Sequence, residues 1–270
     1  MAVARASLRD ASFPVQLLAG TNVGWVQNCE RALAAVQTEW VAFCDQDDVW
    51  MPRKLELQAQ ELERGADMCV TNATIVDAEL RPIGTNLSQK ELDYVRRRGL
   101  LPALFRYNLA QNATIVARTE LVRRVMPTPA GVSFDAWVAF ALAALSHRVV
   151  LLEEPLLLYR QHGANQLGAG RGLGVLGSVR RWRAIAADSR KQRARMADAF
   201  EGQRERLLRL GVTADVEGLL RSKSAHLARR ASLAADRPAA RLAGVAAELL
   251  LGRYHAFGRG PKSVVRDLLA

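Results

Sequence analysis

Three aspartates within four residues are the clearest candidates for chemistry in this sequence. The segment Asp45-Gln46-Asp47-Asp48 directly follows the short apolar run from Trp40 to Cys44. Such a run is typical of a buried parallel strand, and open α/β sheets bind ligands at the carboxyl ends of their strands. Two carboxylates two residues apart can share Mg²⁺ or Mn²⁺ with phosphate oxygens. The alternative is that Asp47 or Asp48 caps a helix beginning near Met51.

Two further strings carry polar residues that could serve the same site. One is Ser133-Phe134-Asp135-Ala136-Trp137, where an acidic residue at a helix start is usually a cap or a charge that offsets the helix dipole. The other runs from Leu158 to Gly168 and contains Tyr159, Arg160 and His162. A lone histidine is more often a surface or packed residue than a ligand, so neither string identifies a site without further context.

The elements that must position these residues form an alternating pattern in the first half of the chain. Strands are predicted over 15–20, 40–44 and 68–76, with helices over 24–37 and 52–64. Pro52 suits the first turn of the second helix. This order implies an α/β domain with right-handed crossovers.

The remaining elements are predicted from their apolar patterns and from glycine and proline. Residues 80–106 read as irregular, with turns at Pro82 and Gly84 and a helix near 89–98. Further elements are a strand over 112–117, a helix over 134–145, and a strand over 149–159 that is broken at Pro155. A glycine-rich stretch over 163–177 indicates a boundary, and residues 178–252 read as helical with interruptions at Gly202, Gly211 and Pro238. We therefore expect one domain over 1–170 and a basic, mainly helical region over 171–270.

Charge is unevenly distributed between these two parts. Residues 171–270 hold 21 lysines and arginines against 9 aspartates and glutamates, a balance of +12, whereas residues 1–170 hold 17 against 18. A basic region can meet nucleic acid, an anionic membrane face or an acidic substrate. No helix-turn-helix, zinc or RNP-like signature accompanies the charge, so we expect no nucleic-acid partner. The arginines over 180–195 read either as a solvated helix face or as a contact with an anionic inner membrane leaflet.

Cysteine content and hydropathy favour a cytoplasmic protein. The three cysteines are odd in number and have no CxxC spacing, which argues against a disulfide framework and a cysteine zinc site. The N-terminus lacks the apolar stretch of a signal peptide. The longest apolar run, 136–145, is too short to span a bilayer. We expect a cytoplasmic chain, peripheral at the inner membrane face if it contacts lipid.

Taken with its surroundings, the acidic segment resembles the metal-binding segment of family 2 glycosyltransferases. The resemblance rests on the string from Trp40 to Glu56, WVAFCDQDDVWMPRKLE, and on the upstream string NVGWVQNCERAL over 22–33. It extends to the strings around Asp135 and His162, and it is closest to the bacterial branch that includes rhamnosyltransferases. The fold that this implies is α/β, a GT-A-like (Rossmann-like) mixed sheet with flanking helices, followed by the C-terminal helical region.

The resemblance also implies a reaction and residue roles. The reaction is an inverting, metal-dependent transfer of a sugar, with rhamnose the sugar of the resembled branch. The donor is a nucleotide diphosphate sugar and the acceptor is a glycan or lipid-linked molecule of cell-surface polysaccharide synthesis in a bacterium. Asp135 would be the catalytic base, and Asp47 and His162 would bind Mg²⁺ or Mn²⁺. The donor would contact the residues Asn22, Gly24, Asn28, Asp45 and Arg160.

The sequence departs from the resembled family in two places. Phe134 stands where a histidine is frequent, which puts contacts next to Asp135 in doubt. The family's opening strand–helix–strand unit, which ends in an Asp-Asp-Gly-Ser-like string, has no counterpart before Pro14, so the expected domain is truncated at its N-terminus. That departure keeps a second hypothesis open, in which the chain is a catalytically impaired relative that acts as a binding or scaffold module.

Overall fold

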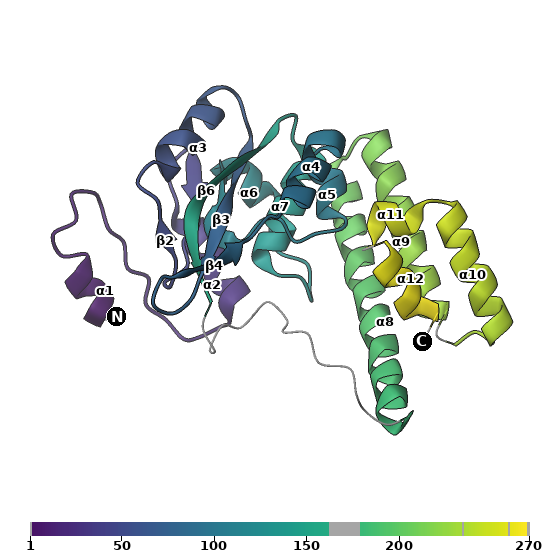
Figure 1. Ribbon diagram of the computed structural model, residues 1–270. Helices are drawn as coiled ribbons and strands as arrows, with labels where there is room; N and C mark the ends of the chain where they lie inside the picture. The colour runs from purple at the N-terminus through teal and green to yellow at the C-terminus, as the bar shows by residue number, and fades with distance from the viewer. Residues whose placement is uncertain (1, 162–178, 234, 259, 269–270) are drawn as a thin grey trace.

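The computed structural model describes residues 2–161, 179–233, 235–258 and 260–268, and its first part is a mixed α/β structure. Six strands form one sheet: β1 (Trp40–Ala42), β2 (Val49–Trp50), β3 (Met68–Val76), β4 (Pro82–Thr85), β5 (Ile115–Arg118) and β6 (Val149–Arg160). The helices of this part are α1 (Ala2–Ser7), α2 (Trp25–Ala35), α3 (Lys54–Glu63), α4 (Gln89–Arg98), α5 (Leu100–Leu104), α6 (Thr119–Val125) and α7 (Phe134–Leu145). Figure 1 shows the later ones around the curled sheet, whereas α1 lies apart from it. The predicted α/β class with a mixed sheet is confirmed.

The sheet has the order β1-β5-β3-β6-β2, and β4 pairs with β3 outside this path. Among the described strands, only β3 and β6 pair in parallel, while β5 runs antiparallel to both β1 and β3. The 40–44 run was expected to be a buried parallel strand, and this is wrong. Because β5 returns between β1 and β3, β1 is an antiparallel edge strand.

The strand expected over 15–20 is absent, and these residues are exposed coil. Strands satisfy their backbone N–H and C=O groups by pairing, and no strand of the described sheet lies beside this segment. In contrast, α2, α3, β3 and α7 lie where the apolar pattern predicted helices and strands. The sequence pattern missed β4 and α5, and it placed a strand over residues that begin with the 3₁₀ turn η1 (Asn112–Thr114).

Of the prolines and glycines that were predicted to interrupt helices or strands, some do and some do not. Strand β6 continues through Pro155, and its pairing with β3 shifts register there instead of ending. Proline lacks the N–H that the ladder would use, which explains the local irregularity. Gly202 lies inside a helix and does not interrupt it, whereas Gly211 and Pro238 do stand at helix boundaries.

The C-terminal region is helical, as predicted: α8 (Val179–Leu210), α9 (Ala214–Leu233), α10 (Pro238–Leu250), α11 (Arg253–Phe257) and α12 (Pro261–Leu268). Figure 1 shows these helices together on one side of the α/β part. One apolar core joins both parts, because Phe105 contacts the rings of Phe140, Phe200 and Phe257 at centroid distances of 5.2, 6.3 and 5.5 Å. Among the described helices, none combines the length and the apolar character needed to cross a membrane.

Candidate functional site

The acidic segment Asp45–Asp48 forms the turn between β1 and β2, and strand pairing determines its neighbours. Strand β1 pairs with β5, whose preceding turn η1 carries Asn112. Strand β2 pairs with the end of β6, where Val49 lies opposite Leu158. The segment is therefore held between the start of β5 and the carboxyl end of β6. Because few residues separate the apolar strands β1 and β2, the polar residues between them must form a tight turn.

Asp45 and Asp48 are half-buried and each accepts one hydrogen bond from a neighbouring element. The side-chain amide of Asn112 donates to Oδ1 of Asp45 at 3.2 Å. Burial raises the pKa of Asp45, the Asn112 hydrogen bond lowers it, and the charges of Asp47 and Asp135 raise it further. The backbone N–H of Arg160 donates to Oδ1 of Asp48 at 3.0 Å.

Asp48 is the more strongly perturbed of these two carboxylates. Burial raises its pKa to about 6, although the Arg160 hydrogen bond opposes the shift. Its second oxygen, Oδ2, is buried and has no hydrogen-bond partner among the described residues. Helix α3 begins at Lys54 after Arg53, which makes no side-chain capping bond. Asp47 and Asp48 therefore do not cap this helix, and the capping alternative is wrong.

Asp135 lies in the first turn of α7, and its side chain is only 7% exposed. Its Oδ1 accepts the N–H of Ala136 at 2.8 Å. Burial raises the pKa of Asp135, while hydrogen bonds from Ser133, Ala136 and the Asn112 backbone lower it. The first-turn position expected from the sequence is confirmed, and Asn112 links this carboxyl to Asp45.

Phe134, which replaces the expected histidine, packs into the core beside this site. Its ring meets Phe43 edge-on at 5.2 Å and Trp25 at 6.4 Å. Phe43 directly follows β1, so this contact fixes the start of α7 against the strand end that carries Asp45. Phe134 therefore places no polar group beside Asp135, and its packing holds the start of α7 in position.

The negative charge of the acidic cluster also raises the pKa of two neighbouring side chains. Burial raises the pKa of Tyr159, and the charges of Asp48, Asp45, Asp47 and Asp135 raise it further in that order. Burial likewise raises the pKa of Cys29 to about 11, with Asp45 and Asp135 contributing. Four like charges thus act on one small region, which is costly without a cation or a proton.

The remaining residues of the predicted site are less closely assembled. Oδ1 of Asn22 accepts the N–H of Gly24 at 3.0 Å, and Gly24 has a positive φ of 95° at the start of α2. Asn28 is exposed on α2, and its N–H donates to the carbonyl of Gly24. Arg160 lies at the end of β6, where its guanidinium donates to the carbonyl of Ala78. His162 lies outside the described residues.

Two buried polar residues near the site were missed in the sequence. Asn112 was treated as part of a strand, although an asparagine that opens an apolar run is itself a polar signal. Lys54 is fully buried, donates to Gln58 Oε1 at 2.8 Å and lies 4.3 Å from the centroid of the Trp50 ring. Burial lowers its pKa to about 8.

Carboxylate oxygens are the donors that Mg²⁺ and Mn²⁺ prefer, so the acidic turn fits a divalent cation. The unpartnered Oδ2 of Asp48 supports this fit. Among the described residues, no three His, Cys, Asp or Glu side chains converge on one point. Mg²⁺ commonly keeps several waters and binds through one or two carboxylates together with substrate phosphates.

Comparison with known proteins points to the same chemistry. Two uncharacterized mycobacterial proteins, one from Mycobacterium bovis and one from Mycobacterium tuberculosis, are each 26% identical to this chain over 155 residues. The matched segment covers 54% of this chain and 41% of each relative. The model of the family described as Glycosyl transferase family 2 matches residues 4–123, which include the acidic turn and α2 but not Asp135 or Arg160. Residues 4–123 are thus similar to a glycosyl transferase family 2 domain.

Proposed function

We propose that this chain transfers a sugar from a nucleotide diphosphate donor to a hydroxyl of a glycan or lipid-linked acceptor, with inversion at the anomeric carbon. The observation that carries the proposal is the meeting of Asp45 and Asp135 at Asn112, with Asp48 near enough to Asp45 for their charges to interact. The match to a glycosyl transferase family 2 domain supports the reaction class. Rhamnose as the transferred sugar rests on the resemblance of the sequence alone.

Asp135 is the proposed catalytic base. An acceptor hydroxyl must lose its proton as it attacks, so a carboxylate must lie within hydrogen-bond reach of it. Burial raises the pKa of Asp135. A carboxylate with a raised pKa holds a transferred proton better than an exposed one, which favours this role. Its bond to the Ala136 N–H keeps Oδ1 oriented at the start of α7.

The acidic turn and Arg160 are the proposed donor site. Asp47 would hold Mg²⁺ or Mn²⁺, joined by His162, and Asp45 would contact the ribose or donor sugar. When bound, the cation stabilises the charge that develops on the leaving diphosphate. Arg160 would bind a diphosphate oxygen, while Asn22, Gly24 and Asn28 would contact the donor from the start of α2. The hydrogen bond from the Arg160 backbone N–H to the Asp48 carboxylate keeps Arg160 next to the acidic turn.

The test compares wild type with Asp135→Asn in transfer assays using a panel of nucleotide sugars with Mn²⁺. Loss of a general base costs about 10²- to 10⁴-fold, so the variant should lose transfer on this scale while calorimetry still detects donor binding. Wild-type transfer rates in Asp135→Asn would reject the base. A folded wild-type protein that binds no donor at millimolar concentration would instead favour a binding or scaffold module.

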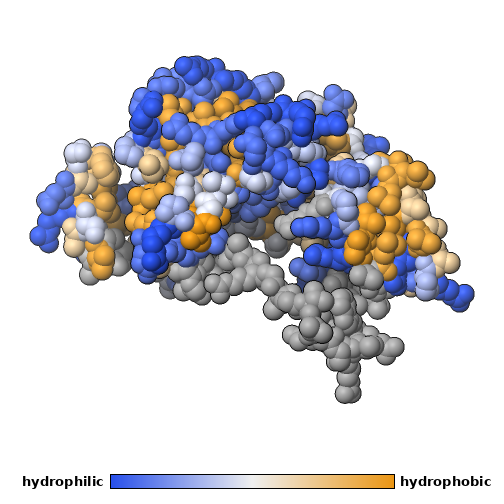
Figure 2. Space-filling view, in the orientation of Figure 1, coloured by the Kyte–Doolittle hydropathy of each residue, from blue (hydrophilic) through white to orange (hydrophobic). Residues whose placement is uncertain are grey.

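A peripheral membrane contact is a second element of the proposal. The basic balance of residues 171–270 is accompanied by exposed leucines on and after α10: Leu242, Leu249, Leu250 and Leu251. Figure 2 shows a hydrophobic patch at the position that α10 occupies in Figure 1. Basic residues attract anionic headgroups, and exposed apolar side chains can enter the interface. Sedimentation with anionic vesicles should show binding that weakens with salt, and the absence of salt-sensitive binding would remove the contact.

A further inference from the structure

A polar cavity lies between the α/β part and the C-terminal helices. Its volume is about 390 Å³, and its walls come from the segment after α5, from α8 and α9, and from α11 and α12. Five cationic side chains and no acidic ones are among the described residues that line it: Arg106, Arg193, Lys223, Arg230 and Arg266. None of these residues belongs to the candidate active site described above.

Arg193 is the strongest sign that this cavity takes a ligand. Its side chain is only 8% exposed, and its Nη2 contacts Asp267 at 3.3 Å and the carbonyl of Arg266 at 3.2 Å. Its Nη1 is buried and has no hydrogen-bond partner among the described residues. A buried guanidinium N–H without an acceptor costs free energy, so an acceptor entering the cavity would be stabilising.

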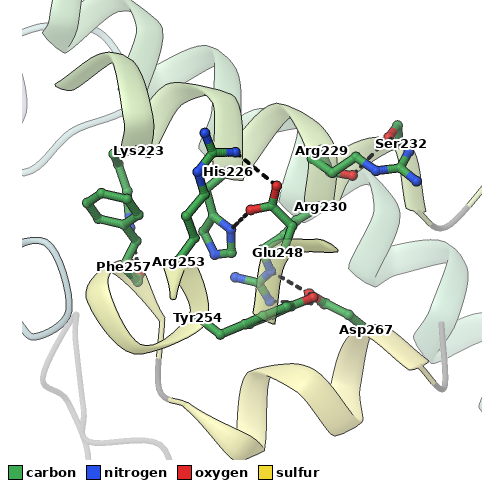
Figure 3. A network of polar contacts seen from close by, with 10 residues as sticks. All are labelled: Lys223, His226, Arg229, Arg230, Ser232, Glu248, Arg253, Tyr254, Phe257 and Asp267. Carbon is green, nitrogen blue, oxygen red and sulfur yellow. Dashed lines mark hydrogen bonds and ion pairs between the residues drawn. The ribbon is translucent and has the colours of Figure 1, made fainter. Parts of the chain in front are cut away.

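The neighbouring charges are only partly neutralised. Asp267 is the buried carboxylate next to the cavity, and Arg230 already binds both of its oxygens at 2.6 and 3.0 Å. Figure 3 shows this pair with Tyr254, whose hydroxyl also donates to Asp267. One carboxylate therefore serves two arginines, and the remaining lining cations have no acidic residue beside them in the wall.

Lys223, on α9, adds a second buried donor. Its ammonium donates to the carbonyls of Phe105 and Phe257 at 2.9 and 2.7 Å, which uses two of its three hydrogens. Burial, together with the smaller effect of the Arg230 charge, lowers the pKa of Lys223 to about 7. A bound anion would favour the charged form of this lysine, which couples ligand binding to its protonation.

We infer that this cavity is a binding site for a phosphate or diphosphate group, held by Arg193 and Lys223 inside and by Arg266 at the exposed rim. Arginine favours phosphate because its planar fork can donate two parallel hydrogen bonds. The lining cations outnumber the one neighbouring carboxylate, Asp267, which favours an anionic ligand. The group could belong to a soluble phosphate compound or to a lipid-linked diphosphate, and the ligand chemistry is the same in both.

The experiment is calorimetric titration of the full chain with pyrophosphate in the presence of EDTA, which removes metal-dependent binding at the acidic turn. Wild type should bind with a dissociation constant below about 1 mM. Arg193→Gln should weaken binding at least tenfold. Because Arg193 also pairs with buried Asp267 and its loss could unfold the protein, Arg266→Gln at the exposed rim provides a second variant, expected to weaken binding severalfold with the fold intact. Arg221→Gln, an exposed arginine on α9 paired with Glu217, is the matched control and should bind as wild type.

A repeat with a short prenyl diphosphate separates the two sources of the ligand. Equal affinity for both compounds supports a soluble phosphate ligand, and at least tenfold tighter binding of the prenyl compound supports a lipid-linked one. The inference is overturned if wild type does not bind pyrophosphate, or if Arg266→Gln binds as tightly as Arg221→Gln. It is also overturned if Asp47→Ala abolishes the binding, since the ligand would then occupy the acidic turn.

Discussion

The two parts of this protein treat buried charge in opposite ways. In the α/β part, the carboxylates of Asp45, Asp48 and Asp135 lie close together. Their like charges repel one another, and few hydrogen-bond donors stabilise them. In the helical part, buried carboxylates are paired: Glu248 contacts His226 at 2.5 Å and Arg253 at 3.0 Å, and Asp267 binds Arg230. Figure 3 shows the Glu248 carboxylate pointing toward His226 and Arg253, and the Asp267 carboxylate pointing toward Arg230.

The difference teaches which buried charges belong to a site and which to the fold. Paired charges satisfy each other, so removing one partner leaves the other buried and destabilises the protein. Like charges gathered in one place destabilise the empty protein and are relieved by a cation, a proton or a substrate. On this criterion we propose a functional role for the acidic turn and a structural one for the His226 network. The cavity at Arg193 combines the two, since its cations outnumber the carboxylate that pairs them.

The largest expected effect tests the structural half of the comparison. Asp267→Ala leaves Arg230 and Arg193 buried without their carboxylate and should cost roughly 3–5 kcal/mol of unfolding free energy. Denaturant unfolding monitored by circular dichroism measures it. Asp198→Ala, an exposed carboxylate on α8, is the control and should change stability by no more than about 0.5 kcal/mol. Equal losses in the two variants would break the distinction.

The functional half is tested by Asp47→Ala. Removing one group that stabilises transition-state charge typically costs about 10²- to 10³-fold in rate, so metal-dependent donor turnover should fall on that scale. The measurement is turnover against Mn²⁺ concentration. Glu56→Gln, an exposed carboxyl on α3, should behave as wild type. An Asp47→Ala protein with full metal-dependent activity would end the metal assignment.

Acid should weaken the helical part through His226. Burial lowers the pKa of this histidine to about 4, and the Glu248 hydrogen bond opposes the shift. A lowered folded pKa means that the unfolded chain binds the proton more tightly, so stability is lost as pH falls from about 6.5 toward 4. The stability of wild type relative to His226→Gln should therefore drop by roughly 2 kcal/mol over this window. A difference that does not change with pH would contradict the assignment.

Asp135→Asn should have the smallest effect on stability and the opposite sign. Because burial raises the pKa of Asp135, the folded state at pH 7 carries the cost of an ionised buried carboxylate. The amide removes this cost and still accepts the Ala136 N–H, so the variant should be about 1 kcal/mol more stable than wild type at pH 7. The gain should shrink as pH falls through the raised pKa toward the unfolded value. Thermal melts at several pH values provide the measurement, and a destabilised variant would place Asp135 among the structural charges.

Much of the fold could be predicted because local patterns dominated. The apolar runs gave β3 and α7 with their observed boundaries, and Pro238 marked the first turn of α10. Pairing partners could not be predicted, since nothing in the run 40–44 distinguishes a parallel core strand from an antiparallel edge strand. The segment 15–20 failed for the same reason: its apolar residues have strand propensity, but a strand requires a neighbour.

The sequence made acidic residues the candidates for the site, and it gave no sign of the roles of Asn112 and Lys54. Asp45, Asp48 and Asp135 are conspicuous in sequence, and the structure brings them together. Asn112 is separated from Asp45 by 67 positions, and only the pairing of β1 with β5 reveals the hydrogen bond between them. The burial of Lys54 depends on its acceptor Gln58, which is itself held by the carbonyls of Cys69 and Thr114. Such tertiary contacts leave no local signal.

The contacts around Phe105 and Arg106 have a consequence for how the chain folds. Arg106 donates to the carbonyl of Gly258, and Lys223 donates to that of Phe105, across 152 and 118 positions of sequence. Closing loops of this length carries an entropic cost, and contacts between distant residues slow folding. The helices and the sheet can each gain local structure earlier, so we expect docking of the helices on α5 to be a late kinetic step. The cationic cavity, whose walls come from both parts, exists only after that step.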